Sequence, residues 1–190
     1  MCNRGQRRGN ETNLETSNIA YWMIRVVHDN PLLAVMRNPH KILGAAGLEE
    51  RQTVLEVGCG PGFFTIPAAE LVGDEGHVYA VDVHPRAVAR VRKKVENRAM
   101  TNVTPLCVNA SDTGLPGGSI DLAFLFGLQH VAGGLDGVIA ELGRVVRPRG
   151  ILSIEKTRGS EAALIEAVAR GGFTFRERRR RIFVFERKEA

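Results

Sequence analysis

The sequence is poor in cysteine and has no long apolar run. Its 190 residues include three cysteines, Cys2, Cys59 and Cys107, which form neither a CxxC pair nor a cluster with histidine. Neither a disulfide framework nor a zinc site is therefore indicated, and we expect no metal. No apolar stretch approaches the length of about 20 residues that a membrane-spanning helix needs, so we expect no membrane insertion.

The N-terminus also lacks the apolar segment of a secretory signal. Its first 18 residues, MCNRGQRRGNETNLETSN, are polar throughout, and we therefore expect a cytoplasmic protein. Residues 1–13 are too polar to bury a core, which predicts a disordered arm. Hydrophobic residues make up 44% of the chain, and the remaining length suits one unit, so residues 14–190 should form a single domain.

The charge is modestly positive and does not by itself indicate a partner. The formal net charge is +5, and the basic residues are spread over several segments. Within residues 86–98, the basic residues alternate with Ala87, Val91 and Val95, which recur at helical spacing. This pattern predicts a helix whose charged residues form the solvated face. The run Arg178–Arg181 falls at the turn of an expected hairpin, where charge keeps a sheet edge soluble. A nucleic-acid partner stays an alternative that the charge does not favour.

Two helices are expected before the first strand. Apolar residues recur at helical spacing between Ile19 and Val27, and Asn38-Pro39 offers an N-cap followed by proline at the first helical position. We expect residues 14–48 to form a helical cover over a core domain made by residues 51–190. Trp22 fits the buried side of the first helix, and His28 fits its exposed end.

Beyond Glu50, short β-branched runs alternate with helical patterns. Strands are expected at 53–58, 77–83, 104–109, 120–126, 150–156, 173–181 and 182–188, and helices at 63–73, 85–99, 131–146 and 160–172. Apolar strands that alternate with helices predict a parallel sheet covered on both faces. The last two strands have almost no connector and must pair antiparallel. The fold class is therefore α/β: a doubly wound, seven-stranded, mostly parallel, Rossmann-like sheet that ends in an antiparallel hairpin.

A glycine-rich turn follows the first expected strand in VLEVGCGPG, residues 54–62. Such a turn is a plain hinge, a phosphate cradle or a platform for a cofactor, and its place at the carboxyl end of a strand favours a cofactor. A dinucleotide fingerprint needs its last glycine at position 63, which is Phe63 here. The sequence instead has Glu56 two residues before Gly58, in the pattern ExGxGxG.

The acid changes which cofactor the turn suits. A carboxylate is a poor neighbour for a doubly anionic pyrophosphate but a good one for an ammonium and a sulphonium group. S-adenosylmethionine carries both cations and a ribose diol. The second strand ends near Asp82, twenty residues after Gly62, where a carboxylate accepts both ribose hydroxyls.

At this point the chain resembles the class I S-adenosylmethionine-dependent methyltransferases, between about Thr53 and Glu186. The segments that carry the likeness are VLEVGCGPG, VYAVDV, CVNASDTGLP, IDLAFLFGLQHV and ELGRVVRPRGILSIEK, in the order that the family shows. The LP before the fourth strand and the helix that ends in RPRG resemble the small-molecule group of quinone-biosynthesis type, methyltransferase type 11.

The resemblance implies a set of cofactor-binding residues. They are Glu56, Gly58, Cys59, Gly60 and Gly62 around the methionyl part, Asp82 for the ribose, Val83 for one face of the adenine, Ser111 or Asp112 for the adenine amine, and Phe126 after the fourth strand. His130 stands where an acceptor would approach, as a general base or as an ordinary helix-start histidine. Tyr21 is a candidate for lining the acceptor pocket.

The acceptor is less determined by the sequence. No [DN]PP[YF] segment follows the fourth strand, where residues 126–129 read FGLQ, so methylation of base or glutamine amides drops in rank. A small-molecule acceptor is expected, with RNA or protein as the alternative. An NAD(P)-dependent reductase is a weaker alternative, because neither Tyr21 nor Tyr79 starts a YxxxK pair. A module that binds the cofactor without transferring a methyl group is the non-enzymatic one.

Overall fold

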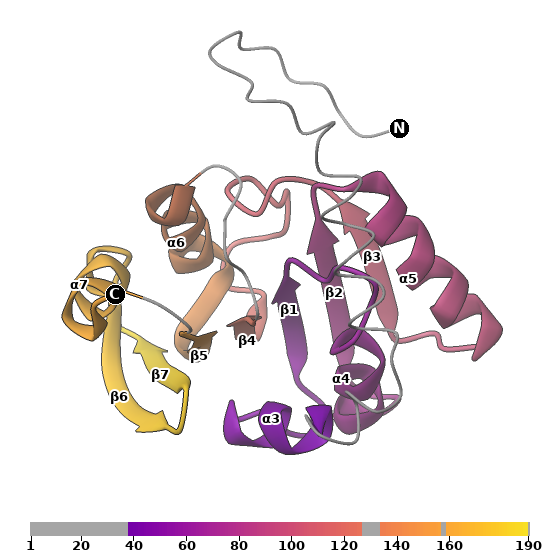
Figure 1. Ribbon diagram of the computed structural model, residues 1–190, viewed down its shortest axis with the longest axis horizontal. Coiled ribbons are helices and arrows are strands. Elements are labelled where there is room, and N and C mark those ends of the chain that lie inside the picture. Colours follow the sequence, from indigo (N-terminus) through magenta and orange to yellow (C-terminus); the bar gives the residue numbers. More distant parts are fainter. Residues whose placement is uncertain (1–37, 127–133, 157–158, 190) are drawn as a thin grey trace, which may run out of the picture.

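A computed structural model describes residues 38–126, 134–156 and 159–189. Seven strands form one sheet in the order β3-β2-β1-β4-β5-β7-β6 (Figure 1). The strands are β1 (Thr53–Val57), β2 (His77–Asp82), β3 (Val103–Cys107), β4 (Ile120–Leu125), β5 (Val146–Glu155), β6 (Phe173–Arg179) and β7 (Ile182–Arg187). Strands β1 to β5 pair in parallel, and β7 pairs antiparallel with both β5 and β6. The predicted fold class is confirmed.

Helices cover both faces of this sheet. They are α3 (Pro39–Ala45), α4 (Thr65–Val72), α5 (Pro85–Asn97), α6 (Gly134–Val145) and α7 (Glu161–Arg170). Apolar residues of α3, α4 and α5 share one core cluster with the sheet, and those of α6 and α7 share the other. Burial on both faces explains why the inner strands β1 and β4 are apolar on both faces rather than alternating. Among the described helices, none has the length and apolarity needed to cross a bilayer.

Helix α3 begins as the sequence predicts. The Asn38 side chain accepts a hydrogen bond from the backbone N–H of Lys41 at 3.1 Å, and Pro39 occupies the first helical position. The cap satisfies one backbone donor that the first turn of a helix leaves without a partner. The rest of the expected cover, residues 14–37, and the expected arm, residues 1–13, lie outside the described residues.

Strand β5 begins four residues earlier than the sequence suggests. A helix was expected through Val146 and a strand from Gly150, but α6 ends at Val145 and β5 starts at Val146. The register with β4 shifts between Ile120 and Leu122, and Arg149 has a left-handed φ of 62°. A Cβ on Gly150 would lie 2.6 Å from Val146 Cγ1. The segment RPRG is therefore a kink inside β5, and its proline and glycine give it the sequence of a turn.

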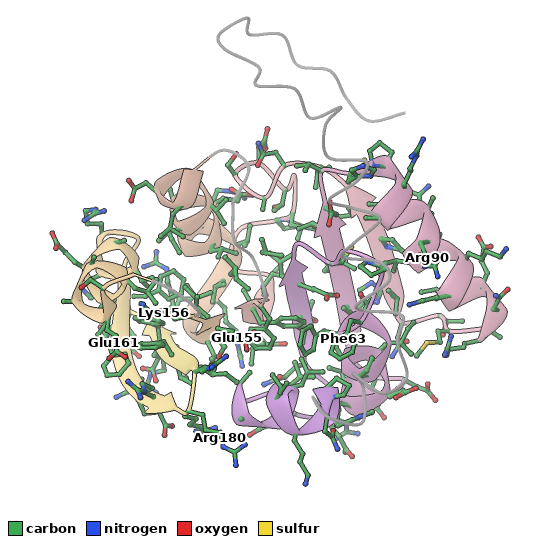
Figure 2. The ribbon with its side chains drawn as sticks, in the orientation of Figure 1. Phe63, Arg90, Glu155, Lys156, Glu161 and Arg180 are labelled. Atoms are coloured by element: carbon green, nitrogen blue, oxygen red, sulfur yellow. The ribbon has the colours of Figure 1, made fainter. Side chains whose placement is uncertain are left out.

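The arginine run lies at the β6–β7 turn, as expected. Arg178 pairs with Glu161 at 2.5 Å and Arg179 pairs with Glu177 at 2.6 Å. Arg180 is exposed and points away from the molecule (Figure 2). The first two arginines are thus held by acids of the same chain, and β6 presents charged side chains along the edge of the sheet.

The chain order reverses at β1, which lies between β2 and β4. The loops after β1, β2, β3 and β4 all leave from the carboxyl ends of parallel strands. In open α/β sheets, ligands bind at this edge, beside the strand where the order reverses. Every sequence-predicted cofactor residue in the described part of the chain lies at one of these four strand ends or in the loop that follows it.

Candidate functional site

The turn after β1 requires glycine at three positions. Gly58, Gly60 and Gly62 all have left-handed backbone, with φ of 75°, 50° and 83°. Residues with a side chain rarely adopt this conformation because Cβ approaches the following carbonyl oxygen. Glycine therefore occupies the three positions of the turn at which the backbone conformation disfavours a side chain.

The backbone N–H groups of this turn tie it to the end of β2. Gly58 and Cys59 both donate to the carbonyl oxygen of Val81, at 2.8 and 3.0 Å. Gly60 donates to Asp82 Oδ2 at 2.9 Å. The first two strands therefore share one hydrogen-bonded corner, and the glycine turn and Asp82 belong to a single site.

Asp82 holds two backbone donors with its two oxygens. Oδ2 accepts from Gly60, and Oδ1 accepts from the N–H of His84 at 2.8 Å. An ionised carboxylate offers about four lone-pair positions, so two of them stay available for further donors. The side chain is half-buried. Its position and remaining acceptor capacity suit a ligand that presents a pair of hydroxyl groups.

Glu56 lies beneath the turn, at the end of β1. It is only 2% exposed, and its Oε2 accepts a hydrogen bond from Thr65 Oγ1, in the first turn of α4, at 2.5 Å. Burial raises the pKa of Glu56 from 4.5 to about 8, although the bond from Thr65 opposes this shift. A cation placed close to the turn would favour the ionised form of this carboxyl group.

Three other predicted residues differ in their exposure. Val83, directly after Asp82, is 40% exposed, which is unusual for a large apolar side chain in this molecule. Cys59 and Phe126 are buried, and Phe126 packs against Phe64 and Phe124 with ring centroids 5.2 and 4.8 Å apart. Burial raises the pKa of the Cys59 thiol, which disfavours its thiolate form. Val83 is open to a ligand, whereas Phe126 and Cys59 support the site from within.

Ser111 and Asp112 lie in the loop after β3. The N–H of Ser111 donates to Asn109 Oδ1 at 3.0 Å, and that of Asp112 donates to the carbonyl oxygen of Asn109 at 2.9 Å. Asn109 thus closes a tight turn around both residues. Ser111 is half-buried and Asp112 is exposed. The loop brings both to the same edge of the sheet as Asp82.

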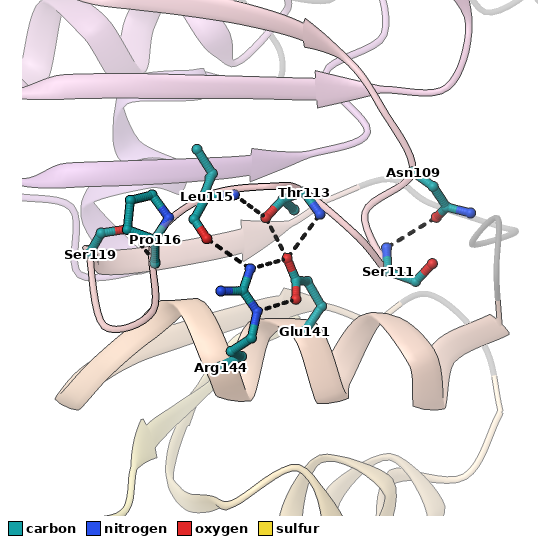
Figure 3. A network of polar contacts seen from close by, with 8 residues as sticks. All are labelled: Asn109, Ser111, Thr113, Leu115, Pro116, Ser119, Glu141 and Arg144. Atoms are coloured by element: carbon teal, nitrogen blue, oxygen red, sulfur yellow. Dashed lines mark hydrogen bonds and ion pairs between the residues drawn. The ribbon is translucent and has the colours of Figure 1, made fainter. Parts of the chain in front are cut away.

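A buried acid that the sequence did not identify fixes this loop from α6. Glu141 accepts two hydrogen bonds from Arg144, Nε and Nη2 each at 2.7 Å, and two from Thr113, its N–H at 2.9 Å and its Oγ1 at 2.5 Å (Figure 3). Arg144 Nη2 also donates to the carbonyl oxygen of Leu115 at 2.8 Å. Hydrogen bonds from Arg144 and Thr113 lower the pKa of Glu141 to about 2. The only sequence signal was an acid and an arginine three residues apart in a helix, which is common on helix surfaces.

Four other residues named from the sequence fall outside the described ranges. Tyr21 and His130, the candidates for the acceptor side, lie outside the described residues, as do Trp22 and His28. Within residues 38–126, 134–156 and 159–189, no three or more His, Cys, Asp or Glu side chains are grouped to hold a metal ion.

A protein family and several curated proteins resemble part of this chain. A family described as "Methyltransferase domain" matches residues 54–150. Aklanonic acid methyltransferase DauC of a Streptomyces species is 37% identical over 71 residues, which are 37% of this chain and 32% of that protein. Demethylmenaquinone methyltransferase of Geobacillus stearothermophilus is 32% identical over 111 residues, 58% of this chain and 47% of that protein. The matches thus span between about a third and a half of the length of these curated relatives.

Solved structures resemble the chain over more of its length. A SAM-dependent methyltransferase from Aquifex aeolicus superposes with a TM-score of 0.76 at 27% identity, covering 87% of this chain and 97% of that one. A Burkholderia thailandensis 1,6-didemethyltoxoflavin-N1-methyltransferase, solved with its substrate and S-adenosylhomocysteine, has a TM-score of 0.67 at 18% identity. It covers 97% of this chain and 94% of that one, a likeness that concerns the fold alone.

Proposed function

The chain belongs to the methyltransferase domain family, and from this premise we propose that it transfers a methyl group from S-adenosylmethionine to a small-molecule acceptor. The observation that carries the proposal is the corner formed by the left-handed glycine turn and Asp82. This corner places backbone without side chains beside a carboxylate that accepts hydrogen bonds, at the strand ends where ligands of this fold bind.

The residues of this corner fit the parts of the cofactor. The Asp82 carboxylate would receive the ribose hydroxyls, and the exposed Val83 would cover one face of the adenine. Glu56, beneath the turn, would place negative charge near the ammonium and sulphonium groups. Ser111 or Asp112 would meet the adenine amine from the loop after β3. These assignments follow from the resemblance of the sequence and are compatible with the positions of the described residues.

When bound, S-adenosylmethionine supplies a methyl group on a sulphonium, which is already an activated leaving group. The protein then needs to align the acceptor in line with the methyl carbon and to exclude water. The glycine turn and Asp82 would fix one end of that alignment. A general base is optional, and His130 is our candidate for one.

A small acceptor is supported by the names of two of the curated relatives. These two are described as methyltransferases of aklanonic acid and of demethylmenaquinone, and both acceptors are small molecules. We propose the cytoplasm as the compartment, as the polar N-terminal residues led us to expect. The reductase alternative has no support in the turn, because its last glycine is replaced by the buried Phe63.

The proposal is tested by binding and by methyl transfer. Calorimetric titration with S-adenosylhomocysteine should show binding, and tritiated S-adenosylmethionine should label a member of a panel of quinols, phenols and small amines. Gly60→Ala should abolish both, because alanine is strained at φ 50° and its methyl group would project into open space at the cofactor turn.

Gly47→Ala is the matched control. Gly47 is also left-handed, with φ 91°, and a Cβ there would meet only Leu122 Cδ1 at 3.8 Å, an ordinary contact, but it lies before β1 at the opposite edge of the sheet. Both variants should lose about 1 kcal/mol of stability, and only Gly60→Ala should lose cofactor. Binding of NADH in place of S-adenosylhomocysteine would refute the proposal. Tight cofactor binding with no acceptor labelled would favour the non-enzymatic alternative.

A further inference from the structure

The connection from β3 to β4 contains no helix. Residues 108–119 are all described, and they form turns and irregular structure between Cys107 and Ile120. Parallel strands are usually joined through a helix, which satisfies its own backbone groups. A loop without one depends on other elements for hydrogen-bond partners, and this loop carries Ser111 and Asp112.

Helix α6 supplies those partners along one face. Gly137, Glu141 and Arg144 are spaced at i, i+4 and i+7, so they lie on the same side of the helix. A Cβ on Gly137 would be 3.4 Å from Ser111 Cβ, which places the helix backbone directly against Ser111. The carbonyl oxygen of Arg144 also accepts from the N–H of Gly118 at 3.0 Å. The helix therefore holds the loop at its beginning, middle and end.

The middle contact is the most specific one. The carboxylate of Glu141 is 7% exposed and receives all four of its hydrogen bonds from Arg144 and Thr113. Arg144 reaches past it to the carbonyl oxygen of Leu115, and Thr113 Oγ1 accepts from the N–H of Leu115 at 3.2 Å (Figure 3). Charged, bidentate and partly buried contacts of this kind fix geometry as well as adding stability.

We infer that Glu141 and Arg144 are positioning residues for the adenine end of the cofactor, which they control by fixing the loop that bears Ser111 and Asp112. The inference rests on the proposed function for the identity of the ligand. Neither residue contacts the cofactor. They determine how well the loop distinguishes the exocyclic amine of adenine from other groups at that position. Hydrogen bonds are directional, so a displacement of the loop by about an ångström would weaken them.

The chain offers a matched control for a purely structural role. Asp121, at the start of β4, also joins an arginine to a backbone donor: its Oδ1 lies 2.7 Å from Arg147 Nε, and its Oδ2 accepts from the N–H of Thr53 at 2.6 Å. This contact lies at the amino ends of β1 and β4, away from the candidate site. Asp121→Asn should therefore destabilise the fold without changing ligand preference.

The first experiment measures how firmly Glu141 holds the loop after β3. Hydrogen exchange of the ligand-free protein should show faster exchange at the amides of Thr113 and Leu115 in Glu141→Gln than in the wild type. Asp121→Asn should leave these amides unchanged. Unchanged exchange in Glu141→Gln would overturn the inference without any ligand.

The second experiment measures discrimination, with S-adenosylhomocysteine and S-inosylhomocysteine, in which a carbonyl oxygen replaces the adenine amine. The wild type should prefer the adenine ligand, and Glu141→Gln should lose about tenfold in affinity for it, with the ratio of the two affinities falling toward one. Asp121→Asn should keep the wild-type ratio. Such a change in ratio is not expected from a general loss of stability.

The outcomes separate the inference from the proposed function. A Glu141→Gln protein that keeps the wild-type ratio overturns the inference alone. A wild type that binds neither ligand overturns the proposed function, and the inference with it. If Glu141→Gln does not fold, Thr113→Val removes the hydroxyl group, which donates to Glu141 and accepts from Leu115, and leaves the backbone N–H of residue 113 in place. This variant should lower the same ratio, and an unchanged ratio there also overturns the inference.

Discussion

Asp82 uses one carboxylate for two purposes. In this structure it holds the N–H groups of Gly60 and His84, and in the proposed function it also binds the ribose diol. A residue that shapes the turn and binds the ligand links folding of the site to recognition. The same link makes its substitution harder to interpret, so the test needs a ligand that removes the ribose contact.

We expect Asp82→Asn to weaken S-adenosylhomocysteine binding by about tenfold or more, because an amide offers one acceptor oxygen and no charge. Calorimetry with S-adenosylhomocysteine and its 2′-deoxy analogue is the measurement. The wild type should prefer the ligand with the full diol, and the variant should lose that preference. An affinity equal to that of the wild type would show that the ribose assignment is wrong.

Glu56 predicts a pH dependence of stability. Its pKa of about 8 in the folded protein exceeds its ordinary value of 4.5 because the carboxyl group is buried. Its contribution is therefore fully present below pH 4.5 and is lost as the pH rises to about 8, because the unfolded chain releases this proton first. Glutamine does not titrate, so Glu56→Gln should not show this loss. The melting temperature of the variant, relative to that of the wild type, should therefore rise as the pH increases from 4.5 to 8.

Thermal unfolding at intervals between pH 4.5 and 8.5 measures the effect. Glu96→Gln, at an exposed carboxylate on α5, is the control and should follow the wild type. Parallel curves for Glu56→Gln and the wild type would contradict a raised pKa at Glu56.

At the scale of elements, the packing of α6 on the chain after α7 determines a local sequence choice. Gly143 lies inside α6, where alanine is the better helix former by about 1 kcal/mol. A Cβ there would lie 2.4 Å from the carbonyl oxygen of Gly171, which is backbone and cannot rotate away. Helix propensity and packing thus predict opposite signs for the same substitution.

We expect packing to dominate, so that Gly143→Ala lowers the free energy of unfolding by about 1–3 kcal/mol. Gly44→Ala is the matched control, because Gly44 also lies in a helix, α3, and a Cβ added there would meet nothing within 4 Å. This control should be stabilised by about 0.5–1 kcal/mol. Urea unfolding of both variants measures the difference, and a stabilised Gly143→Ala would show that the two segments move apart easily.

At the scale of the whole molecule, the seven-stranded sheet joins the two core clusters into one structure. The cofactor corner is formed by β1 and β2 together, and its loops are held from α4 and α6. A ligand bound at this edge should therefore stabilise the domain as a unit rather than one loop.

We expect S-adenosylhomocysteine at about 100 times its Kd to add about 2.7 kcal/mol of stability, and so to raise the melting temperature by about 5–10 °C. Scanning calorimetry should show a single transition that shifts as a whole. NADH at the same concentration should cause no shift, and a shift with NADH alone would contradict the choice of cofactor.

Most of the fold was predictable from the sequence, because it depends on local patterns. The apolar runs, the Asn38 cap and the short connector before Ile182 predicted the seven strands, α3 and the terminal hairpin, and most element boundaries agree within two residues. The start of β5 was wrong, because a kink inside a strand and a turn between elements have the same local composition at RPRG.

The corner made by the glycine turn and Asp82 was predictable from the sequence alone. Glycines and an acid at fixed spacing from two strand ends are brought together by any parallel sheet of this order, because neighbouring parallel strands end at one edge. The burial of Glu56 beneath the turn, and the hydrogen bonds by which Glu141 holds the loop after β3, became visible in the folded structure. These depend on how α4 and α6 pack on the sheet, a contact between residues 28 positions apart in the case of Thr113 and Glu141. Local pattern does not encode which side chains meet across such a distance, and packing of the whole domain does.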